Sequence, residues 1–449
     1  MFLLAIIAVV LGYIVLAEKL RFRRRDSLTS KYPNLDRQSF AHMTLDDAFE
    51  IQLPLAELEF PITFSTSIFF ALFKVCSHPS ALSEIRGGEL ADTTLSSKRA
   101  ADTGVLITEI VLNKPRSGRN LDAIARMNWL HDRYRRAGKI KDEDMLYTLS
   151  LFVLEPVRWT ERFEWRSLSD LERCALAVYW KNLGEVMDIP YDVLPSAKSG
   201  WQDGLHWLEE IEAWSKAYEI KNTVPDEHNR TLALATLTIG LTNVPRIFHG
   251  VGLQFVAALL DQRLRRAMML EEPTWLTQTA LEAAVALRKF LIRHFFLPRP
   301  DFLRSLWFTP EPDPSTGRYH FMRYIGHPWY INPTFTQRWN FKSWVLWLTG
   351  GYLPSKYLPE YRPEGYRIAE LGPVSLEGKG IDEMQGAKQR IMTTFQGCPF
   401  SYKQETTETP HKPKHLHRPA SRGDGVATQD YDSETKRLAK KRVYPNESN

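Results

Sequence analysis

Apolar and polar residues recur along most of the chain with the three-to-four-residue spacing of α-helices. In residues 121–137, one face carries Ile124, Met127, His131 and Tyr134. The opposite face carries Arg126, Arg133 and Arg136. Alternating runs of β-branched residues, which are typical of strands, are nearly absent. The pattern therefore predicts an all-α helical bundle with His131 on the apolar side of one helix.

Local capping signals predict several helix boundaries. Ser169 and Glu172 have the spacing of a capping box, which predicts a helix over 170–187. Asn120 is the predicted N-cap of the helix over 121–137, with Gly138 just past its end. Ser96 and Ser97 are expected to cap a helix that ends near Leu112. Further helices are predicted over 44–58, 142–165 with Pro156 inside, 201–220, 231–241, 245–270 and 276–296.

The N-terminus has the composition of a membrane anchor. Residues 1–17 carry no charged side chain and are just long enough to cross a thin bilayer. Five basic residues follow at once between Lys19 and Arg25, which places the N-terminus in the lumen and the rest in the cytosol. A cleaved signal peptide is the alternative. It would carry positive charge before the apolar run and a small-residue cleavage site after it. Neither is present, so we interpret the segment as a single-pass anchor.

Changes in composition divide the chain into five parts. We expect an anchor over 1–18, a basic flank and linker over 19–43 and a helical catalytic domain over 44–300. An aromatic-rich extension over 301–402 is expected to pack on this core, and 403–449 to be a disordered tail. Two segments stay open to alternatives. Residues 61–74 form either a core helix or a second membrane contact, and the tryptophan-rich residues 301–350 either cap the core or rest at a bilayer interface.

Composition and motifs exclude several function classes. The net charge of +5 over 449 residues is too small for a domain-wide nucleic-acid-binding field, so no nucleic-acid partner is expected. Cys76, Cys174 and Cys398 are widely spaced, which suits a reducing compartment rather than a disulfide framework or a zinc site. Phosphate-binding glycine loops, a GxSxG nucleophile elbow and an HExxH motif are all absent.

Among the twelve histidines, His131 has the most apolar surroundings. His249, which follows Pro245 on a predicted helix, is its competitor. An imidazole in an apolar slot with arginines nearby is what haem requires, namely one axial nitrogen and cations for its propionates. A histidine on an apolar face also occurs as an ordinary core residue, and spacing alone does not separate these two interpretations.

Long segments of the chain resemble a known family. They are KRAADTGVLITEI, RMNWLHDRYRRAGKI, DMLYTLSLFVLEPVRWTERFEWRSLSDLERCA, GWQDGLHWLEEIEAWS and NVPRIFHGVGLQFVAALLDQRLRRAM. Together with the anchor, DDAFEIQLPLAELEFP and the late GCPF, they resemble the fungal ER-bound oxygenases of the mycophenolic acid pathway, the mpaB oxygenase family. This family is distantly related to the bacterial latex-clearing proteins (rubber oxygenases). Those are globin-like helical enzymes with haem b that cleave isoprenoid double bonds with dioxygen.

The resemblance implies roles for four residues. His131 matches the histidine that ligates the haem iron, and Arg99 and Thr103 match the arginine and threonine of the distal helix. Arg99 and Arg135 are the candidates for contacts to the haem propionates. Asp102 is a departure, because the latex-clearing proteins have a lysine before this threonine. Other roles stay open: Arg99 as a surface cation, and Thr103 bonded back to the carbonyl four residues earlier.

The expected function is therefore that of a membrane-anchored, haem-dependent oxygenase in the ER membrane, with its catalytic domain in the cytosol. Its expected substrate is a lipophilic fungal secondary metabolite, such as a meroterpenoid, whose terpenyl C=C bond is cleaved with dioxygen. Two alternatives remain. The same pocket could carry out hydroxylation, epoxidation or rearrangement, or the chain could be a non-enzymatic, membrane-anchored binding protein that retains the fold.

Overall fold

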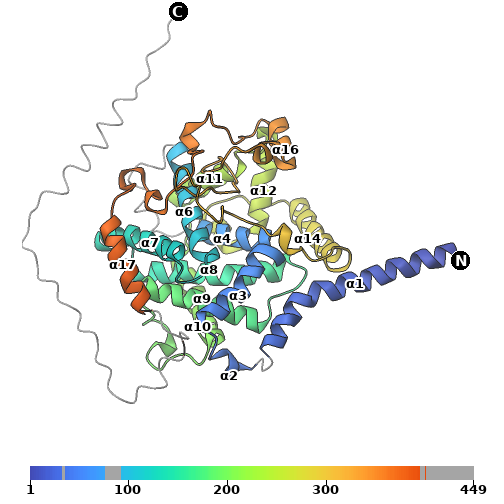
Figure 1. Cartoon of the computed structure of the whole chain (residues 1–449), viewed down its shortest axis with the longest axis horizontal. Coiled ribbons are helices and arrows are strands. Elements are labelled where there is room, and N and C mark those ends of the chain that lie inside the picture. Colours follow the sequence, from blue (N-terminus) through green and yellow to red (C-terminus); the bar gives the residue numbers. More distant parts are fainter. Residues whose placement is uncertain (33–35, 76–92, 395–399, 401–449) are drawn as a thin grey trace, which may run out of the picture. The chain divides into compact units, whose positions relative to one another are not determined.

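The computed structural model describes residues 1–32, 36–75, 93–394 and 400, and within these ranges the secondary structure is helical without strands (Figure 1). Isolated β-bridges join Phe308 to Phe321, Tyr319 to Tyr366 and Phe321 to Ile331. The all-α prediction is therefore confirmed. The expected tail from 403 onward, Cys76 and Cys398 lie outside the described residues.

The helices fall into three groups along the chain. The first group is α1 (Phe2–Lys31), α2 (Arg37–Phe40), α3 (Leu45–Pro54), the π-helix η1 (Leu55–Glu59), α4 (Pro61–Val75), α6 (Thr93–Leu112), α7 (Gly118–Arg136), α8 (Asp142–Phe163), α9 (Asp170–Val186) and α10 (Gly204–Asn222). The second is α11 (Glu227–Leu241), the short 3₁₀ turn η3 (Arg246–Phe248), α12 (His249–Leu259), α13 (Gln262–Ala267) and α14 (Trp275–Phe295). The third is α15 (Phe335–Trp339), α16 (Phe341–Thr349) and α17 (Ile381–Thr394), joined by irregular segments and 3₁₀ turns.

Helix α1 is the one helix within the described ranges that is by itself long and apolar enough to cross a membrane. It continues through the basic residues to Lys31, so the expected boundary at residue 18 falls inside a helix. Its later turns bond to the end of α14 and to the segment that follows it. The Tyr13 hydroxyl donates to the Phe295 carbonyl over 2.8 Å, and the Arg21 Nε donates to the Ile292 carbonyl over 2.9 Å.

Helix α4 belongs to the core. It packs against α8, and it buries Phe64, Phe70 and Phe73. Residues 45–59 and α4 would together be apolar enough for a span, but they meet at a bend of 107°. Of the two interpretations of residues 61–74, the structure therefore supports the core helix.

Two capping predictions are confirmed in detail. Helix α9 begins at Asp170, where the Ser169 hydroxyl accepts from the Glu172 N–H and the Glu172 carboxylate accepts from the Ser169 N–H. This reciprocal arrangement satisfies two backbone donors that a helix leaves without partners. Gly138 has φ +66°, the left-handed conformation that glycine adopts at low cost just past a helix end.

Three boundary predictions are wrong, each because a distant partner or a second cap decides the local structure. Helix α7 begins at Gly118 with Ser117 as its cap, while the Asn120 side chain donates to the Ile110 carbonyl of α6. Helix α6 begins at Thr93, so Ser96 and Ser97 lie inside it. The helix predicted over 245–270 is divided, because Asp261 caps the separate helix α13.

The aromatic-rich extension packs against the α6–α7 hairpin. Helix α17 lies against α7, as Figure 1 shows at the left of the view. The buried Arg126 of α7 donates three hydrogen bonds of 2.7–2.8 Å to the carbonyls of Leu371, Leu376 and Lys379. A guanidinium with backbone carbonyls around it is satisfied without a carboxylate. Arg126 therefore ties α7 to an otherwise irregular segment.

Candidate functional site

Arg99 and His131 lie at the same level of the antiparallel α6–α7 hairpin. Arg99 is 13 residues before Leu112, the last residue of α6, and His131 is 13 residues after Gly118, the first residue of α7. At 1.5 Å per residue, each lies about 20 Å along its helix from the connecting turn. The hairpin therefore brings the two predicted halves of the site to the same height, at its open end.

The spacing of these residues around the axes of α6 and α7 can be compared in the same way. The Asn120 Nδ2 donates to the Ile110 carbonyl over 2.8 Å, which marks the line along which α7 meets α6. Arg99 and Thr103 precede Ile110 by eleven and seven residues, and His131 follows Asn120 by eleven. These separations are close to whole helical turns, so the spacing predicts that the three residues lie on the facing sides of the two helices. The hydrogen bonds beside His131 run to the end of α9, where Asn128 donates to the Val186 carbonyl over 2.9 Å and Arg135 to the Met187 carbonyl over 3.3 Å.

The His131 imidazole has an unsatisfied, buried nitrogen. The residue is half-buried, and its Nδ1 is buried without a hydrogen-bond partner among the described residues. Burial and, to a smaller extent, the cation of Arg135 lower the pKa of His131 to about 4, while Asp132 opposes the shift. The ring is therefore neutral near pH 7, which is the form that ligates a metal. A buried imidazole nitrogen without a partner is unusual and fits a group that the polypeptide itself does not supply.

His249, the competing candidate, has a local partner. Its Nε2 lies 2.8 Å from the Val244 carbonyl, five residues earlier, at the start of α12. This contact fixes Nε2 as the protonated nitrogen and gives the ring an ordinary structural role. The geometry favours His131 over His249 as a ligand.

Thr103 and Arg99 are both half-buried on the facing side of α6. Within the described ranges the Thr103 hydroxyl has no hydrogen-bond partner, whereas Thr108 on the same helix donates to the Gly104 carbonyl over 2.7 Å. The structure thus gives no bond from Thr103 back to the carbonyl four residues earlier. The hydroxyl is therefore available as a donor.

Arg135 is already engaged by other groups. Its guanidinium donates to the Asp142 carboxylate over 2.7 Å and to the carbonyls of Met187 and Asp188 over 3.3 and 3.1 Å. An open surface hollow of about 420 Å³ borders it, and Glu185 also lines this hollow. The Asp142 carboxylate and the nearby Glu185 leave this guanidinium little attraction for a further anion.

Asp102 points to the aromatic-rich extension rather than along the Arg99–Thr103 face. It is buried, and its Oδ2 lies 2.6 Å from the Lys98 Nζ and accepts the Gly372 N–H over 3.1 Å. Its Oδ1 accepts the Tyr330 hydroxyl over 2.5 Å. Burial raises the pKa of Asp102, and the ammonium of Lys98 opposes this shift. All these partners come from α6 itself or from the extension, so Asp102 has a structural role in this fold.

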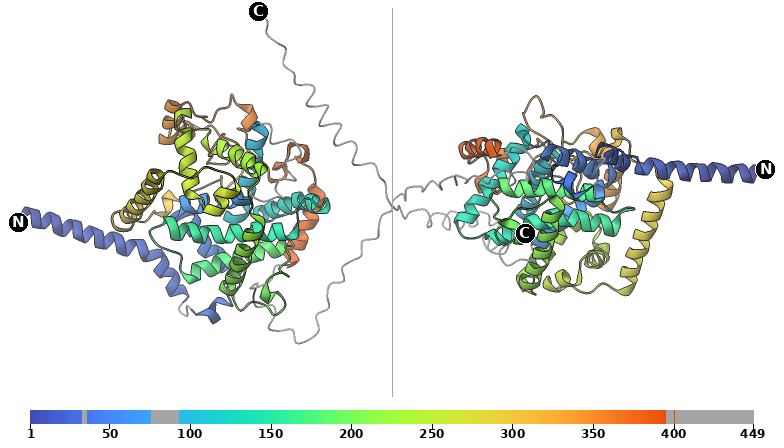
Figure 2. Two further views of the ribbon diagram at one scale, coloured as in Figure 1. Left: turned by 180° about the vertical axis from the view of Figure 1, so that it is seen from behind. Right: turned by 90° about the horizontal axis from the view of Figure 1, so that it is seen from below.

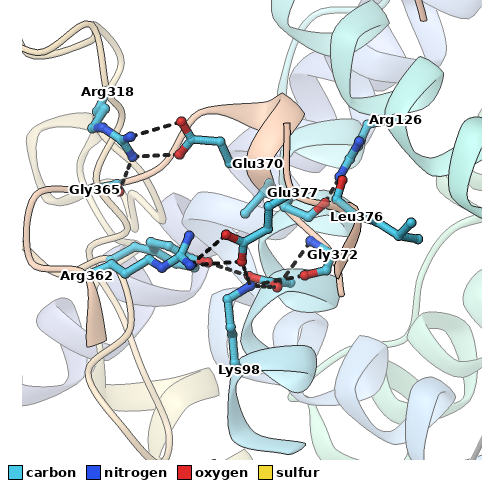
Figure 3. Close-up of polar contacts among 12 residues, drawn as sticks. Lys98, Arg126, Arg318, Arg362, Gly365, Glu370, Gly372, Leu376 and Glu377 are labelled. Atoms are coloured by element: carbon cyan, nitrogen blue, oxygen red, sulfur yellow. Dashed lines mark hydrogen bonds and ion pairs between the residues drawn. The ribbon is translucent and has the colours of Figure 1, made fainter. Parts of the chain in front are cut away.

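Figure 3 shows how this contact continues into the extension. The Lys98 Nζ donates to the Gly372 carbonyl over 3.0 Å and contacts the Glu377 carboxylate at 2.8 Å. Glu377 in turn accepts two hydrogen bonds of 2.8–2.9 Å from Arg362. Sequence reasoning missed Lys98, Glu377 and Arg362, because their spacing along the chain gives no sign that they meet.

Sequence reasoning also missed a second buried contact between α6 and the extension. The Ser97 hydroxyl lies 2.7 Å from the His327 Nδ1 and accepts the Trp329 indole N–H over 3.0 Å. The His327 ring stacks on Tyr361 with ring centroids 5.1 Å apart. Two consecutive residues of α6, Ser97 and Lys98, therefore contact the extension.

A metal site built from several side chains is not found in the described ranges, where no three His, Cys, Asp or Glu residues converge to hold an ion. The arrangement at the open end of the hairpin is of another kind. It offers one neutral imidazole, one hydroxyl and one guanidinium on facing helices, with apolar neighbours such as Met127 and Leu106. A neutral imidazole without a partner would suit a cofactor that brings its own metal, and His131 would be the residue that holds it.

Comparison with known proteins agrees with this class of site. Residues 65–290 match the family described as ER-bound oxygenase mpaB/B′/rubber oxygenase, catalytic domain. These residues include α6, α7 and all four predicted site residues. The chain belongs to this family of oxygenases and is an oxidoreductase.

Three fungal relatives support the assignment over most of the chain. The ER-bound oxygenase mpaB′ of Penicillium brevicompactum is 41% identical over 397 residues, which cover 88% of this chain and 94% of the relative. The ER-bound oxygenase mpaB of the same species is 38% identical over 356 residues, 79% of this chain and 84% of the relative. The ER-bound oxygenase mpaB of Penicillium roqueforti is 45% identical over 267 residues, 59% of this chain and 90% of the relative.

Proposed function

We propose that this oxygenase is haem-dependent and that His131 would hold the iron. The observation that carries the proposal is the neutral His131 ring, whose buried Nδ1 has no partner among the described residues. Haem b would supply the redox chemistry with dioxygen, which the side chains at this position cannot supply themselves.

The residues of α6 have separate roles in this proposal. The Thr103 hydroxyl has no hydrogen-bond partner among the described residues and would be able to donate to dioxygen. Arg99, one turn earlier, would be the cation for a propionate or for orienting the oxygen. The buried apolar neighbours of the hairpin exclude water from the reacting groups.

The proposed reaction is the oxidative cleavage of a terpenyl C=C bond in a lipophilic fungal secondary metabolite, such as a meroterpenoid. In a dioxygenase cleavage both atoms of O₂ enter the products, one on each carbon of the former double bond, so no external reductant is consumed. The support is the membership of a family that includes rubber oxygenases, together with the apolar surroundings of the hairpin.

We also propose that α1 anchors the protein in the ER membrane, with its N-terminus in the lumen and the catalytic domain in the cytosol. The support is the length and apolarity of α1, the basic residues in its second half and the ER-bound description of the relatives. A substrate that partitions into membranes would then be concentrated beside the enzyme.

The test is the visible spectrum of the full chain in detergent after haem supplementation, with and without dithionite and CO. The expected result is a Soret band that shifts on reduction and CO binding, and that is lost or altered in His131→Ala. His249→Ala is the matched control and should leave the band unchanged. A protein without a Soret band overturns the haem proposal, and loss of the band only in His249→Ala overturns the ligand assignment.

The reaction needs its own experiment. Incubation of the haem-loaded enzyme with prenylated phenolic compounds under ¹⁸O₂ should place one labelled oxygen in each of the two carbonyl fragments. Label in a hydroxylated or epoxidised product with an intact carbon chain would overturn cleavage in favour of another oxygenation.

A further inference from the structure

Helix α14 exposes an apolar stripe that no other part of the described chain covers. None of its residues is buried, although it is 21 residues long. Leu276, Ala283, Leu287 and Phe290 are spaced by seven, four and three residues and share its exposed side. Leu287 is 58% exposed and Phe290 is 54% exposed. The opposite side is tied to the core, since Arg288 donates to the Glu164 carboxylate over 2.8 Å.

The exposed stripe continues onto neighbouring elements. Helix α12 packs beside α14, and Asn243, just before η3, accepts the Tyr352 N–H that follows α16 over 2.8 Å. We call the exposed side of these elements the apolar face. Besides the α14 stripe, its large exposed residues are Ile247, Phe248, Val251, Trp275, Phe296, Phe302, Phe335, Phe341, Trp344, Trp347 and Leu348. Exposed apolar side chains gathered on neighbouring elements are typical of an interaction site.

The position of α1 indicates what covers this face. Tyr13 and Arg21 of α1 bond to the carbonyls of Phe295 and Ile292 at the end of α14, so the two helices meet. Figure 2 shows α14 running across the direction of α1, on the side of the domain from which α1 leaves. A helix that crosses a bilayer along its normal would therefore hold α14 parallel to the membrane plane. This is the position of an interfacial helix.

The charged residues near the apolar face are compatible with lipid headgroups. The sequences of η3, α12, α15 and α16 contain no acidic residue. Exposed cations stand around the apolar side chains, namely Arg246, Arg293, Arg338 and Lys342. Tryptophan is enriched where apolar and polar regions of a bilayer meet, and cations there attract anionic headgroups. A water-soluble partner protein would not require this combination beside a membrane anchor.

We infer that the apolar face of α12, α14 and α16 lies in the interfacial layer of the bilayer that α1 spans, which fixes the catalytic domain on the membrane surface. The inference rests on the proposed anchoring by α1. It gives the domain two attachments, one across the bilayer and one along its surface. It also settles which part of the tryptophan-rich segment 301–350 touches lipid, because Trp329 is buried against Ser97 while Trp344 and Trp347 are on the exposed face.

The test places an environment-sensitive NBD label at single introduced cysteines in the full chain, with Cys76→Ser and Cys398→Ser as background. The protein is reconstituted in vesicles of phosphatidylcholine with a minor fraction of phosphatidylserine. Leu287→Cys reports the apolar face and Val9→Cys reports α1. Ile220→Cys is the matched control, since Ile220 is also apolar and is 64% exposed, on α10. Thermal unfolding of each variant checks that the fold is retained.

For Leu287→Cys we expect blue-shifted emission, iodide quenching several-fold weaker than at Ile220→Cys, and strong quenching by lipids with a shallow spin label. Val9→Cys should respond most to a deep spin label. If Leu287→Cys is quenched by iodide as strongly as Ile220→Cys while Val9→Cys stays protected, the surface contact is wrong and the anchor stands. If Val9→Cys is also accessible to iodide, the anchoring fails and the inference with it. Protection of Leu287→Cys without lipid quenching means that protein covers the face, which overturns the inference.

Discussion

The Nζ of Lys98 lies 2.6 Å from Oδ2 of Asp102, and both side chains are almost completely buried. Position 102, for which the resemblance to the latex-clearing proteins implies a lysine, is thus an aspartate in this chain, and Lys98 lies one turn earlier on the same helix. Both charges are used to hold the extension, through Gly372, Glu377 and Tyr330. Lys98 and Asp102 are therefore taken up by the extension, and in the proposed haem site Thr103 and Arg99 are the polar candidates on α6.

Replacing Asp102 should destabilise the protein strongly. Asp102→Ala leaves the Tyr330 hydroxyl and part of the Lys98 ammonium buried without an acceptor, which costs about 3 kcal/mol. A control is Asp132→Ala, which removes an exposed ion pair with Arg136 and should cost at most about 1 kcal/mol. Thermal unfolding followed by circular dichroism measures both. Equal losses of stability in the two variants would show that the buried network contributes no more than an exposed ion pair.

Arg126 should hold the extension on the catalytic helices. Arg126→Met keeps much of the side-chain volume but removes the donors to three buried carbonyls. We expect faster cleavage by a limited amount of trypsin within residues 362–390, because the released segment becomes accessible. Arg136→Met, at an exposed position of the same helix, serves as the control. An unchanged cleavage pattern in Arg126→Met would contradict this role.

Buried His320 should make stability depend on pH. Burial lowers its pKa below the usual 6.5, while the nearby carboxylates of Asp313 and Glu364 oppose the shift. Because its pKa is higher in the unfolded chain, His320 binds a proton at a higher pH there than in the folded protein. The stabilisation is therefore complete above pH 6.5 and is lost as the pH falls below it. The slope is at most about 1.4 kcal/mol per pH unit.

Melting temperatures at pH 7.5, 6.5 and 5.5 measure this effect, and His320→Gln should flatten the decrease. The control is His228→Gln, at an exposed position beside Asp226. If His320→Gln retains the full decrease, other groups cause the acid sensitivity.

The orientation of α1 can be tested with glycosylation acceptor sequences. An acceptor fused before Met1 should be glycosylated in microsomes, because the basic second half of α1 keeps the rest of the chain on the cytosolic side. The same acceptor placed after Asn449 should remain unmodified. The opposite pattern of modification would reverse the proposed topology.

Local sequence signals predict those parts of the fold that local contacts decide. The Ser169–Glu172 box, the position of Gly138 and the helical spacing that puts His131 on the inner side of α7 all involve residues within two turns of one another. The apolarity of α1 is likewise a property of one segment. Such features follow from helix geometry and capping, without knowledge of the tertiary structure.

The incorrect or missing predictions concern residues whose partners are remote in sequence. Asn120 has the character of a cap but bonds to Ile110 across the hairpin. Ser97 also resembles a cap and instead bonds to Trp329, 232 residues away. The spacing of Lys98 and Asp102 permits an ion pair on one helix, but nothing in the sequence shows that Tyr330 and Gly372 complete it. Tertiary hydrogen bonds of this kind override local preference.

Because Lys98 and its partners are far apart in the sequence, the ribosome synthesises Lys98 well before them. During synthesis, 274 residues separate Lys98 from Gly372, which takes a ribosome about 15–60 s at ordinary elongation rates. For that interval Lys98 and Asp102 have each other but lack Gly372, so the side of α6 on which the extension docks stays uncovered. A segment synthesised late thus completes helices that were made long before it, and a chain truncated before residue 372 would leave the ribosome with the α6–α7 hairpin unfinished.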